Sequence, residues 1–185
     1  TQAQVQLRHL GMGSDEAADF QRLAAPIIYA DRRMRALPER VQRGAGAQSG
    51  LWTHRVSGDL PIVLLRIDDM EDIEQVRQLL RAHEYWRMKQ LAVDLVILNE
   101  HAASYVQDLQ AAIETAVRSS QSGPSFEEGL AQGTIHALRA DLIGAAACGL
   151  LQSAARVELI ARHGPIADRL ARLALLEMAS AGDST

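Results

Sequence analysis

From Leu60 onward, the chain alternates short apolar runs with longer segments in which apolar residues recur at helical spacing. This alternation is typical of β-α-β units, which place their strands side by side in parallel. Strands of such a sheet are buried on both faces and therefore read as almost continuous apolar runs. Four runs fit this description, and the sequence predicts strands over residues 61–67, 93–99, 134–139 and 156–161.

Helices are predicted between and after these strands, because the intervening segments have a period near 3.6 residues. Their predicted ranges are 70–90, 104–119, 145–155 and 165–179. On the apolar stripe of the first helix, His83 is expected to be a hydrogen-bonded core residue and Trp86 is expected to face inward. The predicted fold class is therefore α/β, with an open, mainly parallel, Rossmann-like sheet of about four strands flanked by helices.

The region before Leu60 has a different pattern and predicts a helical N-terminal arm. Residues 14–30 fit an amphipathic helix that begins at Ser14 and should kink or restart at Pro26. The glycine-rich stretch at 44–50 is expected to be a flexible link. We expect a helical arm with its linker over residues 1–47 and an α/β domain over residues 48–185. The apolar face of the arm helix could dock a partner or pack on the sheet of its own chain.

Composition excludes several classes of protein. The net charge is −4 and the arginines are scattered among acids, which argues against binding to nucleic acid. No apolar stretch reaches the roughly 18 residues of a membrane span, so the chain is not expected to enter a membrane. Cys148 is the sole cysteine and lies in a run of small residues, where it should pack rather than react. The chain opens at Thr1, and we expect a fragment of a longer protein.

Searches for catalytic and cofactor motifs give no convincing match. A phosphate cradle needs a glycine-rich turn between a strand and a helix, whereas the turn after the first strand is Asp68-Asp69. The six histidines have no His-x-x-x-His spacing, and one cysteine cannot form a Cys-x-x-Cys pair. We therefore expect no catalytic residue, no cofactor and no metal site in this chain.

Polar residues gather at the predicted carboxyl ends of the strands, and this arrangement is the one candidate site. Open parallel sheets bind ligands beyond these ends. The alternative is that the same residues cap helices and solvate loops, as polar strand exits commonly do. Arg66 lies near the end of the first predicted strand. The candidate ligand edge consists of Asp68, Asp69, Asn99, Glu100, His101, Arg139, Asp141, Arg162 and His163.

Six segments read together resemble one known family. They are LGMGSDEA at 10–17, FQRLA at 20–24, QSGLW at 48–52, SGDLPIVLLRI at 57–67, HEYWRMK at 83–89 and LAVDLVILNE at 91–100. The chain resembles an internal segment of the cyclic β-1,2-glucan synthase family, within its C-terminal glycoside-phosphorylase-like region. The resemblance extends from about residue 10 to about residue 170, and none of these segments is a catalytic motif.

The resemblance implies a large parent enzyme in the bacterial inner membrane. Such a parent builds β-1,2-glucan from UDP-glucose with a membrane-embedded glycosyltransferase, closes the ring with a middle module and adjusts chain length with the phosphorylase-like region. The catalytic residues of these enzymes belong to other segments. This segment would be soluble and would lie on the cytoplasmic side, and its partners would be other domains of the parent.

These residues and the resemblance leave two functions from different classes. The first is a non-catalytic structural or interaction domain of the parent enzyme. The second is a glucan- or phosphate-binding module at the carboxyl edge, with Trp52 as the main candidate for stacking on a sugar and with Tyr85 and Trp86 as further aromatics. Only 4% of the residues are aromatic, which favours the first function.

Overall fold

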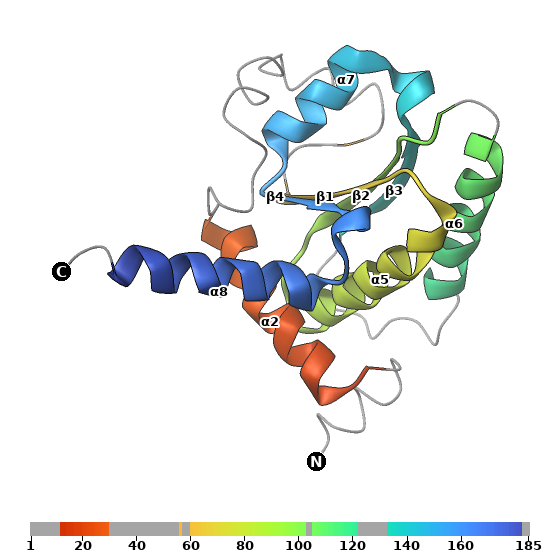
Figure 1. Ribbon diagram of the computed structural model, residues 1–185. Helices are drawn as coiled ribbons and strands as arrows, with labels where there is room; N and C mark the ends of the chain where they lie inside the picture. The colour runs from red at the N-terminus through yellow and green to blue at the C-terminus, as the bar shows by residue number, and fades with distance from the viewer. Residues whose placement is uncertain (1–11, 30–55, 57–59, 103–104, 122–132, 183–185) are drawn as a thin grey trace.

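The computed structural model describes residues 12–29, 56, 60–102, 105–121 and 133–182, and it confirms the α/β class (Figure 1). Four parallel strands form an open sheet in the order β3-β2-β1-β4. Each strand lies inside one of the four predicted runs. The strands are β1 (Ile62–Ile67), β2 (Asp94–Asn99), β3 (Ile135–Arg139) and β4 (Val157–Ile160).

The centre of the sheet is formed by β1 and β2, whose register pairs Ile62 with Asp94 and Ile67 with Asn99. Every residue of β2 is buried, and in β1 only Arg66 is partly exposed. Strands that are apolar on both faces must be covered by helices on both sides. The burial pattern of these two strands therefore requires a three-layer arrangement.

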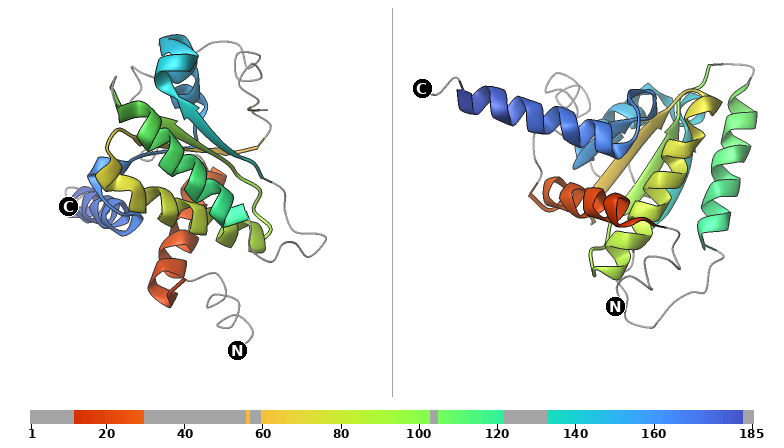
Figure 2. Two further views of the ribbon diagram at one scale, coloured as in Figure 1. Left: turned by 90° about the vertical axis from the view of Figure 1, so that its right-hand side faces the viewer. Right: turned by 60° about the horizontal axis from the view of Figure 1, so that its bottom comes forward.

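Helices cover the two faces unequally (Figures 1 and 2). On one face, Val63, Leu65 and Ile67 share a core with α5 (Ile73–Met88), α6 (Val106–Gln121) and α8 (Ile166–Gly182). On the other face, Ile62 and Leu64 form a smaller core with α7 (Ala140–Ala154). None of the helices in the described ranges is long and apolar enough to span a bilayer.

The start of α5 is set by a capped turn. The turn is η2 (Met70–Asp72), and Asp69 caps it by accepting a hydrogen bond from the N–H of Glu71 at 2.9 Å. The helix ends shortly before Gln90, which has a φ of 63°. The single helix predicted over 70–90 is thus a short 3-10 turn followed by α5.

The predicted helical arm contains α2 (Ser14–Tyr29), which packs on α5 and α8. The indole Nε1 of Trp86 donates a hydrogen bond to the carbonyl oxygen of Phe20 at 2.9 Å, and both residues are buried. Arg81 Nε pairs with Glu16 at 2.6 Å. This helix therefore shares the main core of the α/β domain, while the expected boundary at residues 47 and 48 lies outside the described residues.

The helix predicted over 165–179 is α8, which extends to Gly182, and three further helix predictions need correction. The helix predicted over 145–155 begins at Ala140, directly after β3, and Gly144 interrupts it with a φ of 86°. The helix predicted over 104–119 is α6, which extends to Gln121. In α2 the helix continues through Pro26, which is buried beside Ile27. Apolar packing there outweighs the hydrogen bond that proline cannot donate.

At the amino edge of the sheet, the chain enters β3 very close to β2. Asp94 Oδ1 accepts hydrogen bonds from the backbone N–H of Thr134 at 3.0 Å and from its hydroxyl at 2.7 Å. The Thr134 hydroxyl also lies 2.9 Å from His136 Nε2. These contacts press Gly133 against the backbone of Val93.

Replacing Gly133 with alanine is expected to destabilise the fold. An added Cβ would lie 2.2 Å from Val93 O and 2.9 Å from Val93 N, which are backbone atoms that cannot rotate away. Overpacking of this kind lowers the free energy of unfolding by about 1–3 kcal/mol, measurable by urea denaturation. Gly182→Ala is the matched control, because nothing lies within 4 Å of its Cβ position. Equal losses in the two variants would contradict this account.

The buried His83 should make the stability of the fold depend on pH. Its Nε2 lies 2.8 Å from the carbonyl oxygen of Val93, and burial lowers its pKa below the usual 6.5. As the pH falls below 6.5, the unfolded chain takes up this proton before the folded chain does, so the free energy of unfolding decreases until the pH passes the lowered pKa of the folded state.

His83→Gln keeps an N–H donor and cannot titrate, so it should lose less free energy of unfolding than the wild type between about pH 7.5 and about pH 5.5. Urea denaturation at both values would measure the difference. Identical pH dependence in the variant and the wild type would show that His83 is not responsible.

Candidate functional site

The residues predicted as a ligand edge do meet at one edge of the sheet, because all four strands are parallel. Their side chains make several separate contacts and do not form one cluster. In chain order, Asp68 and Asp69 follow β1, Asn99 ends β2 before Glu100 and His101, Arg139 ends β3 before Asp141, and Arg162 and His163 lie in η4 (Ala161–His163) after β4.

The best-formed contact at this edge is a charge cluster centred on Arg66. Its guanidinium binds both carboxylate oxygens of Glu100 and donates a further bond from Nη1 to Glu158 Oε1 at 3.1 Å. Burial acts to lower the pKa of Arg66, but the hydrogen bonds and charges of Glu100 and Glu158 together outweigh it and raise this pKa. Only 8% of the Glu158 side chain is exposed, and its Oε2 has no hydrogen-bond partner among the described residues.

Sequence reasoning missed Glu158. It lies inside the four-residue strand β4, between the buried Val157 and Leu159. The available signal was the period of two residues, which puts Glu158 on the same sheet face as Leu64 and Arg66. A carboxylate on that face needs a cationic partner, and Arg66 is the nearby arginine on the adjacent strand.

Four other predicted residues at this edge form two separate ion pairs. Arg162 lies 3.4 Å from Asp68, and both side chains are exposed. Arg139 contacts Asp141 at 2.6 and 3.0 Å, and this pairing lowers the pKa of Asp141. These pairs support the alternative that the residues solvate loops and helix ends.

Asn99 has a structural role. Its side-chain amide donates to the carbonyl oxygen of Val106 at 3.0 Å, and its Oδ1 accepts from the backbone N–H of His101 at 3.0 Å. It also contacts Gln110 at 3.2 Å, and all of these bonds are within the protein. Asn99 therefore ties the end of β2 to the first turns of α6 from inside the core.

A hollow of about 360 Å³ lies beyond β1 and β2 at the same edge. Of the predicted residues, it brings together Asp69 and His101. Sequence reasoning missed the other four residues, because it considered only the polar residues that follow each strand. These four lie in η2 and at the start of α6. The hollow is lined by Asp69, Met70, His101, Tyr105, Asp108 and Leu109.

The remaining predictions have mixed outcomes. Trp52 lies outside the described residues, while Trp86 and Tyr85 are buried at 1% and 7% exposure and cannot stack on a sugar. Cys148 is packed beside the smaller core as expected, and burial raises the pKa of its thiol. Within the described ranges, no three His, Cys, Asp or Glu side chains are grouped so that they could hold a metal ion.

Comparison with known proteins gives a relative but no matching family model. The chain is 42% identical over 175 residues to the cyclic beta-(1,2)-glucan synthase NdvB of Rhizobium meliloti (strain 1021). The expected relationship to the cyclic β-1,2-glucan synthases is confirmed. The alignment includes 93% of this chain and only 6% of that synthase, so the chain corresponds to one small segment of a far longer protein.

Breaking the Arg66 cluster should strongly destabilise this synthase-related domain. Arg66→Leu would leave the largely buried Glu158 without a cationic partner. Removal of one partner of a buried pair lowers the free energy of unfolding by about 3–5 kcal/mol, measurable by urea denaturation near neutral pH. Adding Glu158→Leu should restore most of this loss, because apolar replacement of a buried pair is often neutral. If Arg66→Leu alone lowered the free energy of unfolding by less than about 1 kcal/mol, the pair would have only the small energy of an exposed salt bridge.

Proposed function

We propose that this chain is a non-catalytic structural and interaction domain of a cyclic β-1,2-glucan synthase. Its docking face consists of exposed apolar residues on α8 and at the end of α2, and the partner is another part of the same polypeptide. The observation that supports this proposal is that α8 is apolar on two sides, while its own domain covers only one of them.

The covered side of α8 faces the main core. Ile166, Leu170 and Leu173 are buried at 5–7% exposure and follow the spacing of one helix face. These residues lie in the first half of the helix. The second half extends beyond the body of the domain, as Figures 1 and 2 show.

The outward side is also apolar. Leu175 and Met178 are 67% and 72% exposed and continue a stripe that begins with the exposed Ala167 and Ala171. Leu176, between them in sequence, is 60% exposed. Large apolar side chains that are exposed together on one helix are typical of a surface that a partner covers. The stripe therefore indicates a surface that a further polypeptide segment covers.

Exposed apolar residues also lie at the end of α2, a helix that packs against α8. Ile28 is 51% exposed and Tyr29 is 81% exposed. Between the two helices lies a groove of about 440 Å³, which Tyr29 also lines. Large exposed apolar patches mark interaction sites in soluble domains. We define the docking face as Ile28, Tyr29, Leu175, Leu176 and Met178.

The length of the related synthase favours an occupant from the same polypeptide. This chain aligns with 6% of that protein, so most of the polypeptide that could cover the docking face lies outside the aligned segment. Docking within one polypeptide benefits from a high effective concentration, and an apolar face of modest size is then sufficient.

The family resemblance supplies the setting for this domain. It would lie within the phosphorylase-like region, on the cytoplasmic side of the bacterial inner membrane, while other segments transfer glucose from UDP-glucose. The internal pairing of Arg66, Arg139 and Arg162 supports a non-catalytic role, because these cations already have protein partners.

Placing charge on the docking face should impair the full-length synthase without unfolding this domain. In the 185-residue chain, Leu175→Glu with Met178→Glu should change the free energy of unfolding by less than about 1 kcal/mol, because both side chains are exposed. In the full-length enzyme, the same variant should lower glucan yield or protein abundance several-fold, measured in membranes by product analysis and immunoblotting.

Leu142→Glu is the matched control, since Leu142 on α7 is 72% exposed and lies outside the docking face. It should leave yield and abundance unchanged. If the α8 variant retained wild-type yield, ring-size distribution and abundance, the outward face of α8 would not be a docking surface.

A further inference from the structure

The hollow at the carboxyl edge has the composition of a carbohydrate site. The apolar part of its lining is Leu109, which is buried, and Met70, which is 41% exposed. Its rim is polar and includes Asp69, His101 and Asp108. Small-molecule sites commonly combine an apolar lining with a few placed polar groups, and a volume of about 360 Å³ is at the lower end of their range.

Tyr105 supplies an aromatic surface at this rim. It is 64% exposed, and its ring is held edge-on by His101, with a centroid distance of 6.0 Å and an interplanar angle of 72°. Among the described aromatic residues, only Tyr29 is more exposed, and it lies on the docking face. An exposed aromatic ring offers an apolar face to the C–H groups of a sugar and a hydroxyl at its tip.

The polar groups around Tyr105 are mainly hydrogen-bond acceptors. Asp69 is oriented by the bond from Glu71 to its Oδ1, and no contact among the described residues engages its Oδ2. His101 Nδ1 lies 2.9 Å from the carbonyl oxygen of Ala102, so this nitrogen must donate. Nε2 of the neutral ring is then an acceptor.

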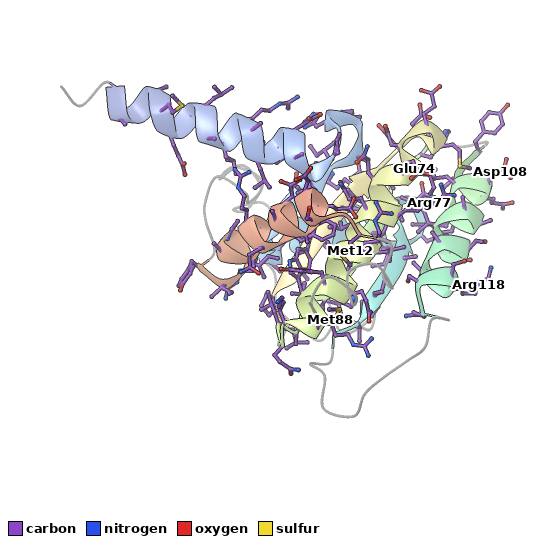
Figure 3. The ribbon with its side chains drawn as sticks, turned by 90° about the horizontal axis from the view of Figure 1, so that it is seen from below. Met12, Glu74, Arg77, Met88, Asp108 and Arg118 are labelled. Atoms are coloured by element: carbon purple, nitrogen blue, oxygen red, sulfur yellow. The ribbon has the colours of Figure 1, made fainter. Side chains whose placement is uncertain are left out.

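Asp108 adds a second carboxylate from the first turn of α6. Figure 3 shows it at the end of α6 that lies beside the start of α5, with Arg118 at the opposite end. Carboxylates and an imidazole acceptor suit a ligand that donates several hydroxyl hydrogen bonds.

The local charge argues against phosphate. Asp68 and Asp69 contribute to a raised pKa at Asp72, after the larger effect of burial, so the field near η2 is negative. An anion entering this hollow would meet the carboxylates of Asp69 and Asp108 without an arginine or lysine in its lining. A neutral polyhydroxyl ligand meets no such repulsion.

We infer that this hollow is a binding site for one or two glucose units of a glucan chain. Tyr105 stacks on a pyranose ring, while Asp69, Asp108 and His101 accept hydrogen bonds from its hydroxyls. The choice of glucan rests on the relationship to the synthase, and the site does not depend on the docking face of α8. It would let this domain hold a glucan chain while chemistry proceeds elsewhere in the enzyme.

Titration of the isotope-labelled 185-residue chain with linear β-1,2-glucan oligosaccharides, followed by NMR, tests this site. The amides of Asp69, His101, Tyr105 and Asp108 should shift with a common millimolar dissociation constant. Tyr105→Ala should weaken binding about tenfold, the size expected for loss of one aromatic contact. Tyr105→Phe keeps the ring and should bind within about twofold of the wild type.

Tyr29→Ala is the matched control, because it removes an even more exposed tyrosine far along the chain and should leave glucan binding unchanged. Inorganic phosphate and Mg²⁺ serve as competing probes and should cause no shift at these amides. Absence of shifts with glucan, equal binding by Tyr105→Ala and the wild type, or shifts with phosphate or Mg²⁺ alone would each overturn the inference. None of these outcomes bears on the docking variant, which is tested in the full-length enzyme.

Discussion

The structure depends on burying β1 and β2 on both of their faces. These strands pair with each other over their whole length, and nearly all of their side chains are inaccessible to water. Each face therefore needs its own helical layer, and the alternation of side chains in β1 assigns Val63, Leu65 and Ile67 to one layer and Leu64 to the other. The polar carboxyl edge also follows from this arrangement, because parallel strands all end on the same side of the sheet.

Charge at the carboxyl edge is distributed according to depth. Where the sheet is covered by α7, Arg66 and Glu158 must be paired, because an isolated ion would be costly to bury. Farther out, Arg162 with Asp68 and Arg139 with Asp141 are exposed pairs of small energetic value. Beyond η2 and the start of α6, carboxylates remain beside an exposed tyrosine, and this is the part of the edge with room for a ligand.

The two proposed surfaces lie on different elements and have different chemistry. The docking face combines the free half of α8 with the end of α2 and is apolar. The glucan site combines the exits of β1 and β2 with the first turn of α6 and is lined by acceptors and apolar side chains. In the function proposed above, one surface fixes the position of the domain and the other binds a glucan chain.

The order of amino acids was sufficient to predict the class of fold, all four strands, and the inward position of His83 and Trp86, because hydrophobic period and burial are local properties of the chain. It also placed Asp69 and His101 at the carboxyl edge of the sheet, where they line the same hollow. The folded chain was needed to reveal that Arg66 bonds Glu158, 92 residues away, and that Tyr105 and Asp108 join the hollow. Those contacts depend on strand order and on where each helix begins, which are set by packing between distant segments.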